Sequence, residues 1–75
     1  MKNYKAIKHF FVVGRGHVFV IDQPASDEDM PKRGDQVSFE GEKGRYIVRD
    51  VEEAVALTYP PRKGSTLGVV ATPLA

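Results

Sequence analysis

Short runs of apolar residues alternate with turn-forming residues along the chain, and this pattern is typical of β-strands. The runs are rich in β-branched and aromatic side chains, and stretches containing Gly, Pro and Asp separate them. We therefore predict six strands, over Lys5 to Val13, His17 to Ile21, Gln36 to Glu40, Arg45 to Glu52, Ala54 to Tyr59 and Leu67 to Thr72. The only helical signal is one turn from Ser26 to Asp29, capped by Ser26 and ended by Pro31. The pattern predicts an all-β fold.

Glycine-containing turns join the predicted strands. Gly14-Arg15-Gly16 and Gly41 to Gly44 are each predicted to form a hairpin turn, because glycine adopts the positive φ that such turns require. Gly34-Asp35 predicts a turn at the entrance of a strand, and Pro60 to Gly64 predicts a stiff connection, because proline cannot donate to a strand ladder. The first of these turns could also cradle a phosphate. A phosphate cradle normally precedes a helix, however, and here a strand follows, so a turn is favoured.

Two stretches of the predicted first hairpin are apolar on both faces. Phe10 to Val13 and Val18 to Ile21 contain no polar residue, whereas a strand of a small barrel usually alternates apolar and polar positions. The second apolar face of these strands must therefore be shielded from solvent by another part of the protein or by a partner. Either the excursion from Asp22 to Gly34 folds over it, or a partner chain packs against it. The excursion offers three apolar residues for this purpose, Pro24, Met30 and Pro31.

The composition is that of one small domain from a reducing compartment. The chain has 75 residues and no cysteine, which excludes disulfides and thiolate metal sites and suits the cytoplasm. The first apolar run ends at Gly14 after four residues, which is too short for a signal peptide. No run approaches the roughly 18 apolar residues of a membrane span. We expect a single cytoplasmic domain over residues 1–75 with no membrane segment.

Charge is distributed unevenly along the chain. Residues 1–21 contain four bases and no acid, residues 22–53 contain all ten acids against five bases, and residues 54–75 add two bases. If the fold gathers the bases of the two ends, one region of the surface will be positive. The net charge of +1 is too small for a dedicated DNA-binding protein.

The order of these turns and strands resembles the second domain of elongation factor Tu and related translational GTPases. The matching positions run through nearly the whole chain: Phe10, Gly14-Arg15-Gly16, Val18, Gly34-Asp35 with Val37, Val48 to Glu52, and Gly64 with Gly68-Val69-Val70. The resemblance implies a small closed six-stranded antiparallel β-barrel. In that family the barrel helps to hold the aminoacylated end of tRNA or touches ribosomal RNA.

The chain also departs from that family in informative ways. After Gly16 the family usually has a threonine and a later glycine, whereas this chain continues His17 to Asp22. The excursion before Gly34 is a few residues longer. The GTPase half is missing from this sequence, because no GxxxxGK phosphate loop occurs, so nucleotide hydrolysis is not implied.

The two histidines flank the first hairpin turn. His9 and His17 could meet across the strand ladder, but a catalytic or metal site also needs a third group. The nearest acid in the sequence, Asp22, lies on the opposite strand face from His17 by period-two counting. We therefore expect surface or half-buried histidines.

Three further motifs have simpler structural explanations. Asp27-Glu28-Asp29 lacks the alternate-position spacing of a calcium loop, so a solvated acidic face is favoured. Arg33-Gly34-Asp35 matches an integrin-binding tripeptide, but its last two residues are needed for a turn. Pro60-Pro61-Arg62 could be a polyproline ligand, although a connection between barrel strands explains it equally well.

Function is predicted to be binding rather than catalysis. The candidate binding residues are bases, with two tyrosines that could stack on nucleobases: Lys2, Lys5, Lys8, Arg15, Arg62, Lys63, Tyr4 and Tyr59. RNA or a ribonucleoprotein is the first expected partner. The alternative is a protein partner or homodimer bound through the apolar first hairpin. No catalytic residue, metal, cofactor or nucleotide site is expected, unless a pocket gathers one of the histidines with Asp22 or Asp50.

Overall fold

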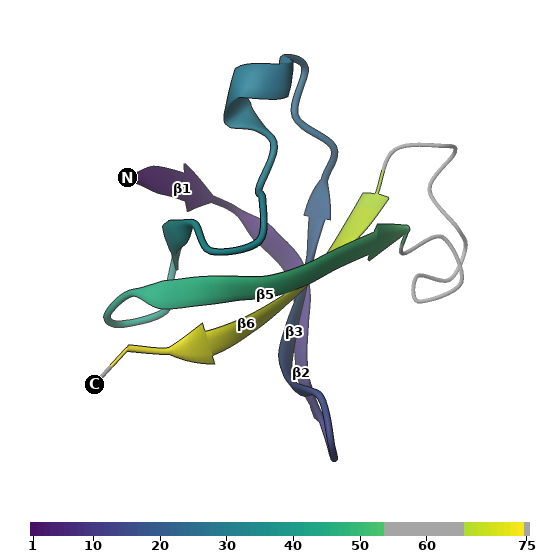
Figure 1. The fold of residues 1–75 in the computed structure, drawn as a ribbon, viewed down its shortest axis with the longest axis vertical. Coiled ribbons are helices and arrows are strands. Elements are labelled where there is room, and N and C mark those ends of the chain that lie inside the picture. Colours follow the sequence, from purple (N-terminus) through teal and green to yellow (C-terminus); the bar gives the residue numbers. More distant parts are fainter. Residues whose placement is uncertain (54–65, 75) are drawn as a thin grey trace.

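The computed structural model describes residues 1–53 and 66–74, and these residues form one curled six-stranded sheet (Figure 1). The strands are β1 (Lys2–Tyr4), β2 (Ala6–Val12), β3 (Gly16–Asp22), β4 (Gln36–Phe39), β5 (Tyr46–Glu53) and β6 (Thr66–Pro73). A single 3-10 turn, η1 (Asp27–Asp29), lies between β3 and β4. The order across the sheet is β1-β4-β5-β6-β3-β2. The prediction of an all-β fold is confirmed.

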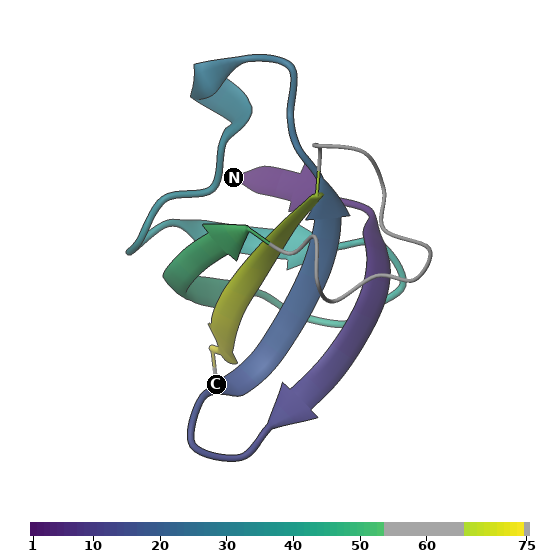
Figure 2. The ribbon, with the colours of Figure 1, turned by 90° about the vertical axis from the view of Figure 1, so that its right-hand side faces the viewer.

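The sheet is a half-barrel, so the prediction of a closed, fully antiparallel barrel is wrong. β1 runs parallel to β4, with Lys2 opposite Val37, while the other neighbouring strands are antiparallel. β1 and β2 follow each other along the chain but stand at the two edges of the sheet, so the sheet curls back toward itself (Figure 2). The pairing of β1 with β4 ends at the hydrogen bond from the N–H of Glu40 to the carbonyl of Tyr4. Beyond this bond the chain turns into β5, and β3 is the one neighbour of β2 among the described strands.

The predicted strand boundaries agree with the structure except at the N-terminus. The first predicted strand, from Lys5, is two strands, because the chain changes its pairing partner at Lys5 and extended structure begins at Lys2. The predicted strand from Ala54 to Tyr59 and the proline-rich connection that follows lie outside the described residues. The predicted turn at Ser26 is present as η1, although the Ser26 hydroxyl bonds the Asp29 carboxylate instead of capping the backbone.

A β-bulge in β5 keeps charge out of the core. The register of β5 against β6 shifts between Val48 and Asp50, so Arg49 is the extra residue. Val48 is fully buried and Val51 packs against the core, three positions later instead of two or four. The bulge therefore turns Asp50 outward at a position where strict alternation would have buried it.

Stacked aromatic rings form the centre of the core. Phe19 and Phe39 are almost fully buried and lie face to face, with ring centroids 3.8 Å apart. Tyr46 packs edge-on against both rings. Aliphatic side chains complete the cluster on the inner face of the half-barrel: Ile21, Val37, Val48, Leu67, Val69 and Ala71.

The second face of β3 is buried within the single chain. Val18, Val20 and Val70 are at most 4% exposed, although they alternate with the residues of the core cluster and lie on the opposite face. Met30 of the excursion does not cover this second face of β3, because it packs against the core cluster on the inner face. The exposed large apolar residues of the first hairpin are Ile7, Phe11 and Val13, at 38%, 64% and 90%. Burial of β3 therefore requires no partner chain.

Gly14-Arg15-Gly16 forms the hairpin turn between β2 and β3. The N–H of Arg15 donates to the carbonyl of Val12, which closes a four-residue turn, and Gly14 at its third position has a φ of 87°. Gly16 has a φ of 103° and begins β3 directly. The sequence interpretation of this motif as a turn is confirmed, since a strand and not a helix follows it.

Candidate functional site

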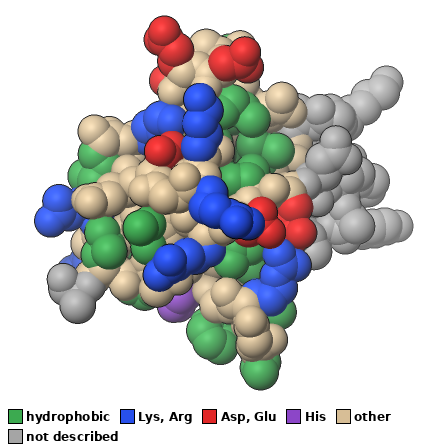
Figure 3. Space-filling view, in the orientation of Figure 1, with side chains coloured by type: hydrophobic (Ala, Val, Ile, Leu, Met, Phe, Trp, Pro, Cys, Tyr) green, Lys and Arg blue, Asp and Glu red, His purple; other side chains and the backbone are tan. Residues whose placement is uncertain are grey.

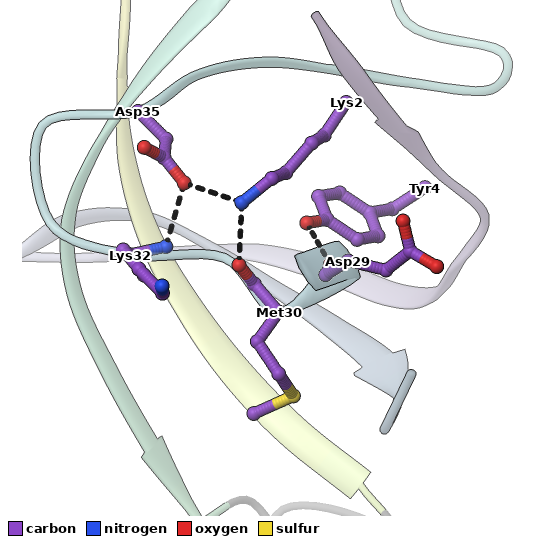
Figure 4. A network of polar contacts seen from close by, with 6 residues as sticks. All are labelled: Lys2, Tyr4, Asp29, Met30, Lys32 and Asp35. Carbon is purple, nitrogen blue, oxygen red and sulfur yellow. Dashed lines mark hydrogen bonds and ion pairs between the residues drawn. The ribbon is translucent and has the colours of Figure 1, made fainter. Parts of the chain in front are cut away.

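The side chains of β1 tie the N-terminus to the excursion and to the turn before β4 (Figure 4). The Lys2 ammonium donates to the Met30 carbonyl at 2.7 Å and to the Asp35 carboxylate at 2.9 Å. The Tyr4 hydroxyl donates to the Asp29 carbonyl. Tyr4 is 9% exposed and packs on a core phenylalanine. Both side chains therefore hold the fold together, and the Tyr4 ring is covered.

The same network shifts two pKa values. The hydrogen bond from Lys2 lowers the pKa of Asp35, with further lowering from the Lys32 backbone N–H and from the charges of both lysines. Burial, together with the smaller effects of the negative charges of Asp35 and Asp29, raises the pKa of Tyr4 to about 12. The network is therefore arranged around a charged Asp35 and a protonated Tyr4.

The guanidinium of Arg15 lies beside two carboxylates of β5. It is 2.8 Å from the Glu52 carboxylate and 3.7 Å from Asp50, and Arg33 lies 3.9 Å from the same aspartate. The two pairs of Arg15 connect the first hairpin turn to β5. The acids that the bulge turns outward thus neutralise the arginine that the sequence had suggested for phosphate binding.

Lys5 and Lys8 are the members of the predicted binding set that are exposed and have no ion pair with the described part of the chain. Lys5 lies between β1 and β2 and borders an open groove of about 630 Å³. Other groove residues are Asn3, Asp22, Gln23 and Pro24. Lys8 projects from β2 opposite Val20. The remaining predicted residues, Tyr59, Arg62 and Lys63, lie outside the described residues.

The two histidines meet across the β2–β3 ladder. Nε2 of His9 is 2.9 Å from Nδ1 of His17, and Nδ1 of His9 is 3.3 Å from a carboxylate oxygen of Glu42. Glu42 comes from the turn between β4 and β5. Its side chain contacts β2, although β2 is not a neighbour of β4 or β5 in the sheet. The meeting of the two histidines was predicted as an open possibility, but Glu42 was not predicted beside them, because the folded sheet brings it there from a separate hairpin.

Aromatic side chains support this histidine pair and extend to the solvent. His9 stacks on Phe19 with ring centroids 4.0 Å apart, and this stack continues into the core. Phe11 meets His17 edge to face at 5.3 Å. Because Phe11 is 64% exposed on an edge strand, it offers an aromatic surface that the sequence analysis did not single out. The alternation of His9 and Phe11 on one face of β2 was the available signal.

The visible face carries a mixture of charged and apolar side chains. Figure 3 shows acidic side chains at the η1 end and again near the middle, Lys and Arg side chains mostly across the middle, and hydrophobic side chains over much of the face, including the end formed by the first hairpin. The predicted gathering of the N-terminal bases occurs only in part, since Lys2 and Arg15 are neutralised by acids.

Comparison with known proteins adds no family to this picture: no protein-family model, curated protein or solved structure matches the chain. Within residues 1–53 and 66–74, no helix is long and apolar enough to cross a membrane. The same residues contain no group of three or more metal-ligating side chains.

Proposed function

We propose that this chain is a non-enzymatic binding module that holds single-stranded RNA along β2. The observation that carries the proposal is the combination of an exposed aromatic ring on the edge strand β2 with exposed cations on this strand and directly before it. Phe11 is 64% exposed, and Lys5 and Lys8 are free of ion pairs with described residues. We call these three residues the β2 surface. Aromatic stacking with backbone neutralisation is the usual way of binding single strands.

The geometry of an edge strand supports this role. Among the described strands, β2 pairs with β3 alone, and all of its side chains are exposed or half-buried. An RNA strand following this edge would meet Lys5 and Lys8 with its phosphates and Phe11 with a base. Lys5 also borders the groove beside β1, which continues the path toward the N-terminus.

The resemblance to the second domain of elongation factor Tu also favours RNA as the partner. The matching positions are turns and strand residues such as Gly14-Arg15-Gly16 and Gly34-Asp35, and they concern the scaffold. A half-barrel scaffold with cations on an exposed edge is compatible with the RNA contacts that this family makes.

Fluorescence anisotropy with a labelled single-stranded oligoribonucleotide at low salt tests the proposal. Replacing Lys5→Gln and Lys8→Gln together should weaken binding and reduce the slope of log affinity against log salt by about 0.7 per lost phosphate contact. The matched control, Lys32→Gln with Lys43→Gln, removes the same charge from exposed positions elsewhere and should leave the affinity within about twofold. Equal weakening by both pairs would show that only net charge matters and would refute the β2 surface.

The exposed apolar hairpin favours a second candidate, a protein-interaction or homo-oligomeric module. Phe11 and Val13 are exposed near the turn that ends β2. Among the described strands β2 stands at the edge of the sheet, and an edge strand is a common site of strand addition. Light scattering over a concentration series distinguishes this role from the first. A concentration-dependent dimer that Val13→Lys abolishes supports assembly, and a monomer at all concentrations argues against it.

A further inference from the structure

We propose that the pair of His9 and His17 makes RNA binding by the β2 surface dependent on pH, because the pair offers a charged donor to phosphate only after it takes up one proton. This inference rests on the proposed function. The two rings contact each other across the β2–β3 ladder, and His17 meets Phe11 edge to face at 5.3 Å. A nucleotide whose base stacks on Phe11 would therefore bring its phosphate groups close to the histidine pair.

A hydrogen bond between the two rings determines which nitrogen can contact a ligand. Nε2 of His9 lies 2.9 Å from Nδ1 of His17, so one of these nitrogens donates and the other accepts. Nδ1 of His9 lies 3.3 Å from a carboxylate oxygen of Glu42. The fourth ring nitrogen, Nε2 of His17, has no hydrogen bond or ion pair with the described residues. A phosphate contact at the pair would therefore be made by Nε2 of His17.

Glu42 sets the direction of the hydrogen bond in the neutral pair. A carboxylate beside Nδ1 of His9 favours hydrogen on that nitrogen, and Nε2 of His9 then accepts from Nδ1 of His17. Neutral His17 therefore has its hydrogen on Nδ1 and a lone pair on Nε2. Because a lone pair cannot donate to a phosphate oxygen, the neutral pair does not hold RNA.

One added proton changes the free end of the pair and leaves the bond between the rings intact. The proton goes to Nε2 of His17, which becomes a charged donor while Nδ1 continues to donate to His9. Imidazole side chains usually take up protons between about pH 5 and 8, and a charged donor makes a hydrogen bond about twice as strong as a neutral one. A second proton would occupy Nε2 of His9 and break the bond between the rings, so the pair acts with a single proton.

The other groups packed against the pair do not change charge near neutral pH. Besides Glu42, the titratable side chain beside it is Tyr46 of β5, whose ring meets His17 edge to face at 6.0 Å. Burial, followed by the charge of Glu42, raises the pKa of Tyr46, so its hydroxyl stays protonated. Two further neighbours, Phe19 of β3 and Ala71 of β6, are apolar. The chain has no third histidine, so a pH effect in this range can be assigned to the pair by mutation.

Fluorescence anisotropy with a labelled single-stranded oligoribonucleotide at pH 6 and pH 8, at constant ionic strength, tests the inference. The wild-type chain should bind more tightly at pH 6, by about threefold or more. His17→Gln should remove this difference and keep the wild-type affinity at pH 8 to within about twofold. Glu42→Gln allows the neutral pair to place hydrogen on Nε2 of His17, so its affinity at pH 8 should approach that at pH 6. The matched control, Glu40→Gln, removes an exposed acid from the same turn and should retain the difference.

A measurement on the wild-type chain makes the test independent of how the variants fold. Calorimetric titration with the same oligoribonucleotide at pH 7, in two buffers of different ionisation enthalpy, should show net uptake of up to about one proton for each RNA bound. Equal affinities at pH 6 and pH 8, no proton uptake, or an undiminished pH effect in a folded His17→Gln variant would overturn this inference and leave RNA binding by β2 standing. No binding at either pH would overturn the proposed function as well.

Discussion

The Lys2 ammonium lies 2.9 Å from the Asp35 carboxylate and joins the first strand of the chain to the turn that opens β4. The same carboxylate accepts the backbone N–H of Lys32, so one side chain fixes both the turn and the parallel pairing of β1 with β4. The short β1 contributes only three residues to the sheet. Its attachment therefore depends on this ion pair and on Tyr4.

Asp35→Asn should destabilise the fold at neutral pH by about 1 kcal/mol, the scale of a partly exposed ion pair. Because the pKa of Asp35 is lowered in the folded state, its contribution is complete above the ordinary value of 3.8 and is lost as the pH falls through the folded value. Urea unfolding at pH 7 and pH 3 measures this. The difference in the free energy of unfolding between wild type and Asp35→Asn should be smaller at pH 3 than at pH 7. The control variant Glu28→Gln should match wild type at pH 7. An unchanged difference at pH 3 would show that the charge of Asp35 does not stabilise the fold.

Tyr4→Phe should make the chain less sensitive to alkali. Tyr4 has a folded-state pKa raised to about 12 from 10.0, so its stabilisation is complete below pH 10 and is lost between about pH 10 and 12. A two-unit shift corresponds to about 2–3 kcal/mol. Comparing urea midpoints at pH 8 and pH 11 should show a larger loss for wild type than for the variant. Equal losses would mean that other groups control alkaline unfolding.

Gly14→Ala should destabilise the first hairpin by about 1 kcal/mol, because the φ of 87° at this position strains any residue with a Cβ atom. No atom lies within 4 Å of the added Cβ, so the cost comes from the backbone alone. Gly14→Asn is the matched control, since asparagine tolerates positive φ better than alanine does. Thermal unfolding should rank the three proteins as glycine, asparagine, alanine. A fully stable alanine variant would contradict the turn geometry.

Phe19→Ala should leave little folded protein, whereas Phe11→Ala should be nearly neutral for stability. Phe19 is fully buried in the aromatic stack, and such a truncation costs about 3–5 kcal/mol against a total of roughly 4–11 kcal/mol for a chain of 75 residues. Phe11 is 64% exposed, so its loss should change stability by no more than about 0.5 kcal/mol. Circular dichroism with urea unfolding measures both, and a strongly destabilised Phe11→Ala protein would show that its ring supports the fold.

Much of the fold could be predicted from the sequence because it depends on local signals. Runs of β-branched and aromatic residues located five of the described strands, and glycines with positive φ, such as Gly14 and Gly34, marked their turns. β1 was missed because Lys2-Asn3-Tyr4 is short and polar, and its parallel pairing depends on contacts across more than 30 residues, such as Lys2 with Asp35. The bulge at Arg49 was missed because no local signal distinguishes it from an alternating strand.

The candidate site was less predictable, since it depends on which side chains the curled sheet brings together. Tyr4 was expected to be a surface ring for stacking, but it is buried and bonded to the excursion. Arg15 is exposed at its turn as expected, but the carboxylates of Asp50 and Glu52 beside it could not be read from the sequence. Phe11 and Glu42 were overlooked because their positions relative to His17 and His9 are set by tertiary structure.

Mapping the RNA contact by NMR tests the central claim most directly. Titrating the isotope-labelled chain with a single-stranded oligoribonucleotide at low salt should shift the amide signals of β2, residues 6–12, and those beside Lys5 before any others. The side-chain signals of Phe11 should shift in the same titration, as expected for a ring that stacks on a base. Shifts confined to η1 or β5, or no shifts at any RNA concentration, would contradict the proposal that β2 binds RNA.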